Sequence, residues 1–189
     1  MASLIHPERS FSTLILLYLR AVIPTLVRLP ARLPDSFPKG ISGVLKILTN
    51  PKAILDPKTM PEGEELIAHL RGSMSIVAAC LPILVKGDEG AKDQLSHLNS
   101  GLLHLCVPSA GVSIWIDWDG KELKSNWGNP PRQPDVILDF KTAQTAYLAF
   151  SKQLDELSAI GRGDLVVTGM LPFADGMNGV MDRVSYYLK

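Results

Sequence analysis

The C-terminal half of the chain alternates apolar and polar residues with a period of two. Five short runs follow this pattern, and four of them have one clearly apolar face: residues 103–107, 112–118, 123–127, 136–140 and 165–169. Alternation of this kind is typical of strands that bury one face. Asp119-Gly120, between the second and third runs, is a two-residue hairpin signal. The pattern therefore predicts a one-sided five-stranded sheet whose apolar face is covered by helices.

Elsewhere the apolar positions recur at helical spacing, and prolines divide the first third of the chain into short pieces. A helix from Phe11 is predicted to end or kink at Pro24, and residues 25–37 are predicted to run extended. Further helices are predicted over residues 41–48, 62–85, 91–98, 142–154 and 173–188. The predicted division is a helical, proline-punctuated extension over residues 1–86 and a domain over residues 87–189.

Composition and charge narrow the classes of function. The chain has 189 residues, 46% of them hydrophobic, and its 19 basic residues balance its 19 acidic ones. This balance argues against a nucleic-acid partner. The apolar stretch 11–29 is interrupted by Arg20, Pro24 and Arg28, too often for a membrane span. A buried helix, or one that lies on a membrane surface, remains for this stretch.

Candidate chemistry is sparse. The four histidines are scattered without metal-ligand spacing, so the sequence predicts no metal site. Asp117 and Asp119 share a strand face, but Asp119 suits the hairpin turn better than a catalytic pair. Gly161-Arg162-Gly163 follows a helix and precedes a strand, which is the reverse of a phosphate loop and typical of a helix cap. Cys80 and Cys106 lie in apolar runs and read as core residues. We expect no catalytic residue and no cofactor.

The C-terminal part of the chain has a pattern of apolar residues and glycines at set positions. These are Asp135-Val136, Gln153-Leu154-Asp155, Ala159, Gly161, Gly163, Leu165, Val167, Gly169, Leu171, Ala174, Met177 and Met181. At these positions, and over roughly residues 101–188, the sequence resembles the sterol-carrier-protein-2 (SCP2) sterol-binding domain family. Gln153 departs from the pattern, since the family commonly has glycine there. The proline-punctuated N-terminal section is similar to SCP2-domain accessory proteins of ubiquinone biosynthesis, which bind isoprenoid intermediates.

The resemblance implies an α+β fold, with a five-stranded, mostly antiparallel sheet, helices on one face and an apolar tunnel between them. It also implies a non-enzymatic protein that binds or transfers a sterol, fatty acyl chain, phospholipid or isoprenoid. The predicted lipid-binding residues are the inward-facing ones: Ile114, Ile116, Trp127, Leu138, Phe140, Tyr147, Phe150, Val167, Met170, Phe173, Met177, Val180 and Met181. The final helix is expected to act as a lid over them.

Two alternatives stay open. The same apolar residues would also suit an ordinary filled core, in a ligand-free interaction module. The protein could instead be an accessory or scaffold subunit that presents isoprenoid-quinone intermediates to enzymes. The N-terminal helices could dock on the domain, contact a membrane surface or pair with a second copy. The expected location is the cytoplasm, with or without peripheral membrane contact.

Overall fold

The computed structural model describes residues 11–28 and 60–188. The five strands are β1 (Gly101–Val107), β2 (Val112–Trp118), β3 (Leu123–Trp127), β4 (Val136–Phe140) and β5 (Leu165–Gly169). The helices around them are α5 (Gly63–Gly87), α6 (Glu89–Ser96), α7 (Ala143–Phe150), α8 (Glu156–Arg162) and α9 (Leu171–Leu188), with a short 3-10 turn, η4 (Pro108–Ala110). The N-terminal segment comprises α1 (Phe11–Leu17), the π-helical η1 (Tyr18–Val22) and α2 (Ile23–Arg28). The helix predicted over residues 41–48 lies outside the described residues.

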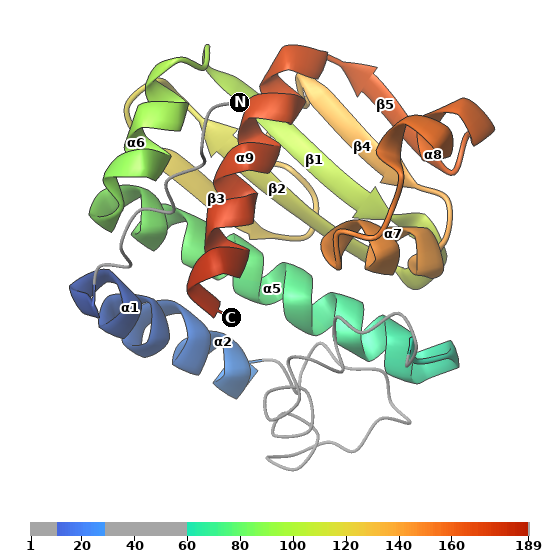
Figure 1. Ribbon diagram of the computed structural model, residues 1–189, viewed down its shortest axis with the longest axis horizontal. Coiled ribbons are helices and arrows are strands. Elements are labelled where there is room, and N and C mark those ends of the chain that lie inside the picture. The colour runs from blue at the N-terminus through green and yellow to red at the C-terminus, as the bar shows by residue number, and fades with distance from the viewer. Residues whose placement is uncertain (1–10, 29–59, 189) are drawn as a thin grey trace, which may run out of the picture.

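The strands form one sheet in the order β3-β2-β1-β4-β5. Three neighbouring pairs are antiparallel, and only the central pair β1–β4 is parallel. Helices α5, α7 and α9 cover one face of the sheet, and α1 and α2 lie alongside α5 (Figure 1). The predicted α+β fold with a mostly antiparallel sheet and helices on one face is confirmed.

The strand register places the apolar residues of neighbouring strands opposite one another. Leu105 of β1 pairs with Ile114 of β2 and with Leu138 of β4, and Leu138 pairs in turn with Val167 of β5. Because side chains alternate between the faces of a sheet, one consistent register sends all of them toward the helices. The helix-covered face of the sheet is therefore apolar across at least four strands.

Helix α5 packs over β2 and β3 and supplies residues to both halves of the core. Leu81 and Leu84 belong to the half shared with α9, and Leu66, Leu70 and Met74 to the half shared with α7. The helix is long and apolar enough to cross a membrane, yet most of its apolar stretch is buried inside the domain. The boundary predicted at residue 86 falls at the end of this helix. The prediction placed the helix in the N-terminal extension, but its buried residues pack in the same core as the sheet.

The N-terminal helical run does not end at Pro24, which was one of the two predicted outcomes, and residues 25–28 are helical where the prediction had an extended segment. It continues to Arg28, and a π-helical turn over Tyr18–Val22 comes immediately before the proline's turn. A proline in an α-helix lacks the N–H for its hydrogen bond, and its ring collides with the carbonyl four residues earlier. A π turn locally widens the backbone, and such turns are a known accommodation of irregular positions inside helices.

The helix predicted over residues 142–154 ends earlier than predicted, at Phe150, and a second, unpredicted helix follows it at Glu156–Arg162. Helix α7 ends at Phe150, and Lys152 adopts a left-handed conformation with φ 59°. The Gln153 N–H donates to the carbonyl of Leu148, which completes a left-handed helix end. The Asp155 side chain then accepts a hydrogen bond from the Ser158 N–H and caps α8.

Candidate functional site: a cavity between the sheet and helices α7, α8 and α9

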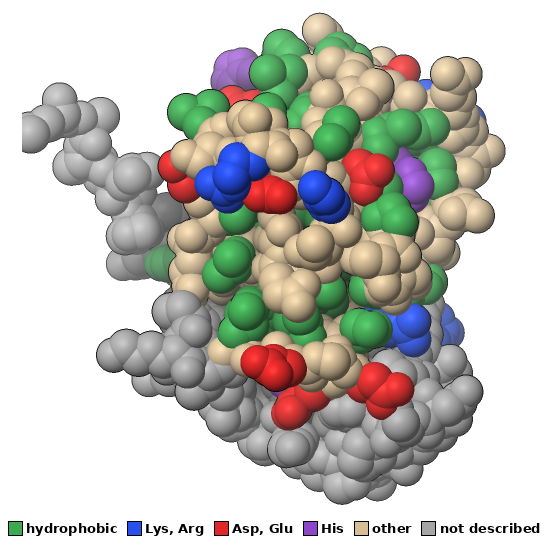
Figure 2. Space-filling view, turned by 90° about the vertical axis from the view of Figure 1, so that its right-hand side faces the viewer, with side chains coloured by type: hydrophobic (Ala, Val, Ile, Leu, Met, Phe, Trp, Pro, Cys, Tyr) green, Lys and Arg blue, Asp and Glu red, His purple; other side chains and the backbone are tan. Residues whose placement is uncertain are grey.

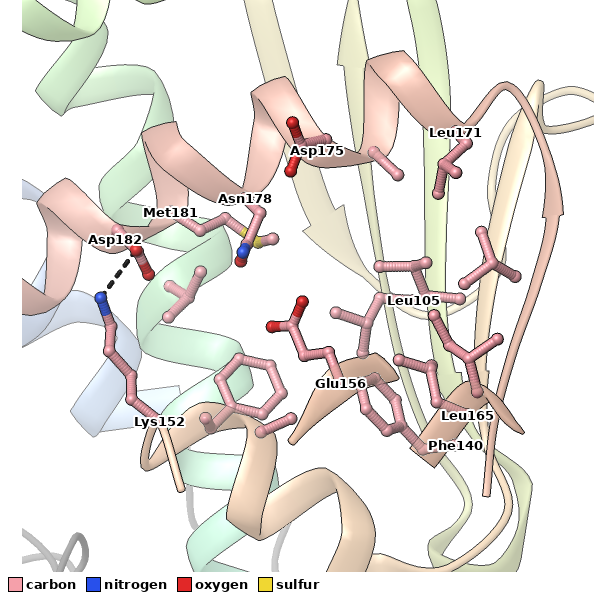
Figure 3. A pocket seen from close by; sticks show the side chains of 17 residues that line it. Leu105, Phe140, Lys152, Glu156, Leu165, Leu171, Asp175, Asn178, Met181 and Asp182 are labelled. Atoms are coloured by element: carbon pink, nitrogen blue, oxygen red, sulfur yellow. Dashed lines mark ion pairs between the residues drawn. The ribbon is translucent and has the colours of Figure 1, made fainter. Parts of the chain in front are cut away.

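A cavity of about 130 Å³ lies between the sheet and the C-terminal helices and opens to solvent on one side. Its floor comes from three strands: Leu105, Leu138, Phe140, Leu165 and Val167. Its walls come from the helices and the segment between α7 and α8: Val77, Ala149, Phe150, Lys152, Glu156, Ile160, Leu171, Ala174, Asp175, Asn178, Met181 and Asp182. The cavity is therefore apolar toward the sheet and becomes polar toward the helices (Figure 3).

One face of α9 forms the longest wall. Leu171, Ala174, Asn178 and Met181 recur at helical spacing, and all four line the cavity. The other flank of α9 packs against α6, and there Gly176 lies so close to Leu98 that any larger side chain would collide with it. With this flank packed against α6 and Leu98, the cavity-lining face of α9 is turned toward α7 and α8.

A buried polar cluster anchors the C-terminal half of α9. The Arg183 guanidinium donates to both Asp88 oxygens, Nε to Oδ1 at 2.7 Å and Nη2 to Oδ2 at 2.8 Å. The Tyr187 hydroxyl donates to Oδ2 at 2.8 Å, and the Ala91 N–H to Oδ1 at 2.7 Å. Burial alone would raise the pKa of Asp88, but the hydrogen bonds from Arg183, Tyr187 and Ala91 outweigh it and hold that pKa below its usual value. The N-terminal turn of α9, in contrast, begins with the exposed Leu171.

Charged and polar side chains surround the opening of the cavity. Lys152 Nζ lies 2.7 Å from Asp182 Oδ2, and this ion pair joins the end of α7 to α9. Glu156 of α8 projects toward α9, and Asn178 projects from α9 into the same space (Figure 3). Asp175 completes the set from α9. We call Lys152, Glu156, Asp175, Asn178 and Asp182 the polar mouth.

Exposed apolar side chains lie beside this opening. Leu157 and Ile160 of α8 and Leu171 of α9 are exposed, and the latter two also line the cavity. Figure 2 views the molecule from the right-hand side of Figure 1, where α8 and β5 lie. On that face, hydrophobic side chains are interspersed with charged ones of both signs.

Five of the predicted lipid-binding residues line this cavity: Leu138, Phe140, Phe150, Val167 and Met181. The other eight lie elsewhere. Six are fully or almost fully buried among packed neighbours: Ile114, Ile116, Tyr147, Phe173, Met177 and Val180. Met170 is partly buried beside the α9 half of the core, and Trp127 lines a second hollow of about 90 Å³ next to α2. Contact of any of the thirteen with a ligand stays a prediction.

Several lining residues were not predicted. Leu105 and Leu165 share the inward strand face with predicted residues, so the alternation itself contains the signal that identifies them. The polar mouth has no comparable signal in the sequence. Lys152, Glu156 and Asp182 are ordinary solvent-facing residue types, and the turn between α7 and α8 brings them together only in space.

The face of the sheet opposite the cavity carries a histidine, a cysteine and a carboxylate close together. Cys106 of β1 pairs with Asp139 of β4, and His104 lies two residues before Cys106 on the same face. Burial, followed by the Asp139 carboxylate, raises the pKa of the Cys106 thiol to about 11. Burial also lowers the pKa of His104, and the charge of Asp139 only partly opposes this. At neutral pH the cysteine is therefore a thiol, not the thiolate that nucleophilic catalysis requires.

No family model matches the sequence, and no curated protein matches it. Among solved structures, the chain is similar to a UbiJ-SCP2 ubiquinone synthesis protein, with a TM-score of 0.44 and 15% identity over 58% of this chain and 88% of that one. It is similar to a possible sterol carrier protein from Thermus thermophilus, with a TM-score of 0.44 and 18% identity over 59% and 83%. For the sterol carrier protein domain 2 of Helicoverpa armigera, the TM-score is 0.43 and the identity 14%, over 67% of this chain and 94% of that one. All three are described as sterol carrier proteins or SCP2 proteins, which is the family that the sequence resembles.

Proposed function

We propose that the protein binds the apolar end of a lipid in the cavity between the sheet and helices α7, α8 and α9, without catalysing a reaction on it. The observation that carries this proposal is the floor of Leu105, Leu138, Phe140, Leu165 and Val167 beneath an opening to solvent. A filled core would close over such a floor, because protein interiors are packed without sizeable voids. Concave apolar sites with a few polar groups at one end are typical of small-molecule binding.

The size of the cavity limits what it holds in this conformation. At about 130 Å³ it is close to the roughly 150 Å³ apolar cavity known to take up benzene. It is well below the ~300 Å³ at which ligand pockets usually begin. In this conformation the cavity therefore admits only the end of a lipid chain, and a whole lipid would require the cavity to widen.

Helix α9 is the element that can widen it. Its C-terminal half is tied to Asp88 through Arg183 and Tyr187, whereas its N-terminal turn is exposed at Leu171. An outward movement of the first turn, with Leu171, would widen the opening between α9 and β5 while the anchor holds, and a larger movement would have to expose the buried Phe173 and Met177. The exposed ion pair of Lys152 with Asp182 lies beside the anchored Arg183, so it belongs to the half of the helix that stays in place.

A series of primary alcohols of increasing chain length tests the proposal, with affinity measured by displacement of a fluorescent fatty alcohol. Each methylene that enters the cavity contributes about 0.8 kcal/mol, which is about a fourfold gain in affinity. We expect the affinity to keep rising past the chain length that fills the cavity at its present volume, and then to level off. Absence of binding by every alcohol, together with no lipid extracted from the purified protein, would contradict the proposal.

The N-terminal segment has an exposed apolar face, which is relevant to the predicted membrane contact or pairing with a second copy. Ile15, Leu19, Ile23 and Val27 are exposed at near-helical spacing along α1, η1 and α2. An apolar face of this kind suits either partner, and both stay predictions. The cavity proposal does not depend on which of them occurs.

A further inference from the structure

The polar mouth is unbalanced in charge, and the imbalance bears on which ligands the cavity accepts. Four charged side chains line the cavity: the carboxylates of Glu156, Asp175 and Asp182 and the ammonium of Lys152. Three negative charges against one positive charge give the mouth a net formal charge of −2. The chain as a whole is neutral, so this local excess is a property of the site.

The one positive charge is already engaged. Lys152 Nζ lies 2.7 Å from Asp182 Oδ2, so these two side chains largely neutralise one another. Glu156 and Asp175 form no ion pair with any other residue of the described ranges 11–28 and 60–188. They lie on opposite walls, Glu156 on α8 and Asp175 on α9, and Asn178 adds only a neutral amide between them (Figure 3).

The position of these carboxylates determines which end of a ligand meets them. An amphiphile enters with its apolar end toward the floor, because a buried polar group without hydrogen-bond partners is strongly unfavourable. Its polar end then remains at the mouth, between Glu156 and Asp175. A negatively charged end would face two like charges near the protein surface, where charge interactions are stronger than in bulk water.

We propose that the cavity selects apolar ligands whose polar end is uncharged or positively charged, and that Glu156 and Asp175 exclude ligands with an anionic end. This inference rests on the proposed function and makes it more specific. Long-chain alcohols, sterols and other neutral prenyl or alkyl compounds have polar ends that suit the mouth. Fatty acid anions and anionic phospholipids do not.

The test compares three ligands with the same ten-carbon chain: decanol, decylamine and decanoate, at neutral pH and low ionic strength. We expect decanol and decylamine to bind at least about tenfold more tightly than decanoate, as two nearby like charges require even after partial screening. Added salt should narrow the difference, because exposed charges are screened. Equal affinities for decanol and decanoate would overturn the inference.

Two matched double variants test whether Glu156 and Asp175 cause the preference for decanol over decanoate. Glu156→Gln with Asp175→Asn removes the two unpaired carboxylates and should bring the decanol and decanoate affinities within about threefold of one another, since the repulsion is lost. Glu89→Gln with Asp93→Asn changes the net charge equally on the exposed face of α6, on the other flank of α9, and should leave the ratio unchanged. If the ratio of decanol affinity to decanoate affinity changes equally in both double variants, the selection does not come from Glu156 and Asp175, and the inference is overturned.

The inference and the proposed function fail in different ways. If decanol, decylamine and decanoate all fail to bind the unmodified protein, the cavity is not a lipid site and the proposed function fails. If decanoate binds as tightly as decanol and Lys152→Gln weakens decanoate alone, the lysine recognises anions. In that case lipid binding stands and only the charge selection is wrong.

Discussion

Asp88 is the residue on which the position of the last helix depends. Its carboxylate caps α6 through the Ala91 N–H and accepts hydrogen bonds from Arg183 and Tyr187, which lie one turn apart on α9. Gly90 leaves the space that the Arg183 guanidinium occupies, because a side chain there would collide with it. A buried carboxylate with this many donors is stabilising only while all of its partners are present.

We expect Asp88→Asn to lower the free energy of unfolding by about 3 kcal/mol, because it leaves the Arg183 charge without its partner in a buried site. Asp93→Asn, a change to an exposed carboxylate on the same helix, should alter it by less than about 0.5 kcal/mol. Urea unfolding of both variants measures the difference. Equal losses of stability in the two variants would contradict the claim that Asp88 anchors α9 through a buried cluster.

The pH dependence of this anchor follows from the lowered pKa of Asp88. The folded protein holds this pKa below the ordinary value of 3.8, so the carboxylate adds its full stability above about pH 3.8. That stability is lost as the pH falls below 3.8 through the folded-state pKa and the carboxylate takes up a proton. The stability gap between wild type and Asp88→Asn should therefore be constant from pH 7 to 5 and narrow near pH 3.

At the scale of the elements, helix α5 contains a proline whose missing hydrogen bond is replaced from the sheet. Pro82 lies inside the helix and has no N–H to donate to the carbonyl of Ala78, four residues earlier. The Ser125 hydroxyl of β3 donates to that same carbonyl at 2.5 Å. The carbonyl that Pro82 leaves free therefore forms a direct hydrogen bond between α5 and β3, the edge strand of the sheet.

A double-mutant cycle tests this substitution of donors. Ser125→Ala alone should lower the free energy of unfolding by about 1–2 kcal/mol, because the Ala78 carbonyl loses its donor. In a Pro82→Ala background the new N–H can bond the carbonyl, so Ser125→Ala should cost at least about 0.5 kcal/mol less. Additive effects of the two substitutions would show that the serine does not replace the proline's hydrogen bond.

The sequence predicted regular elements well and their interruptions poorly. All five strands lie where the two-residue alternation placed them, because a half-buried strand imposes that period directly. The end of α7 was missed because Lys152, which is not a glycine, adopts the left-handed conformation that breaks the helix. The continuation past Pro24 was missed because the π turn that accommodates it has no signature in residue type.

At the scale of the whole molecule, the cavity exists because the helices cover the sheet incompletely. Helices α5 and α6 pack tightly around α9 on one side, whereas α7 ends early and α8 turns away toward β5. The sequence indicates which residues face inward, but not where neighbouring helices leave space between them. Met177 and Met181 illustrate the limit: both share the apolar face of α9, yet only Met181 lines the cavity.

The central claim is that an apolar ligand lies on the floor that β5 helps to build, and two adjacent valines of that strand test it most directly. Val167 lines the cavity, whereas Val166 faces the opposite, exposed side of the sheet. Val167→Trp should fill the cavity and weaken the binding of a fluorescent long-chain alcohol about tenfold or more, which corresponds to the loss of roughly 1.5–3 kcal/mol of apolar burial. Val166→Trp should bind the alcohol like the wild type, with thermal unfolding confirming that both variants are folded. Undiminished binding by folded Val167→Trp would contradict the claim that the ligand occupies this cavity.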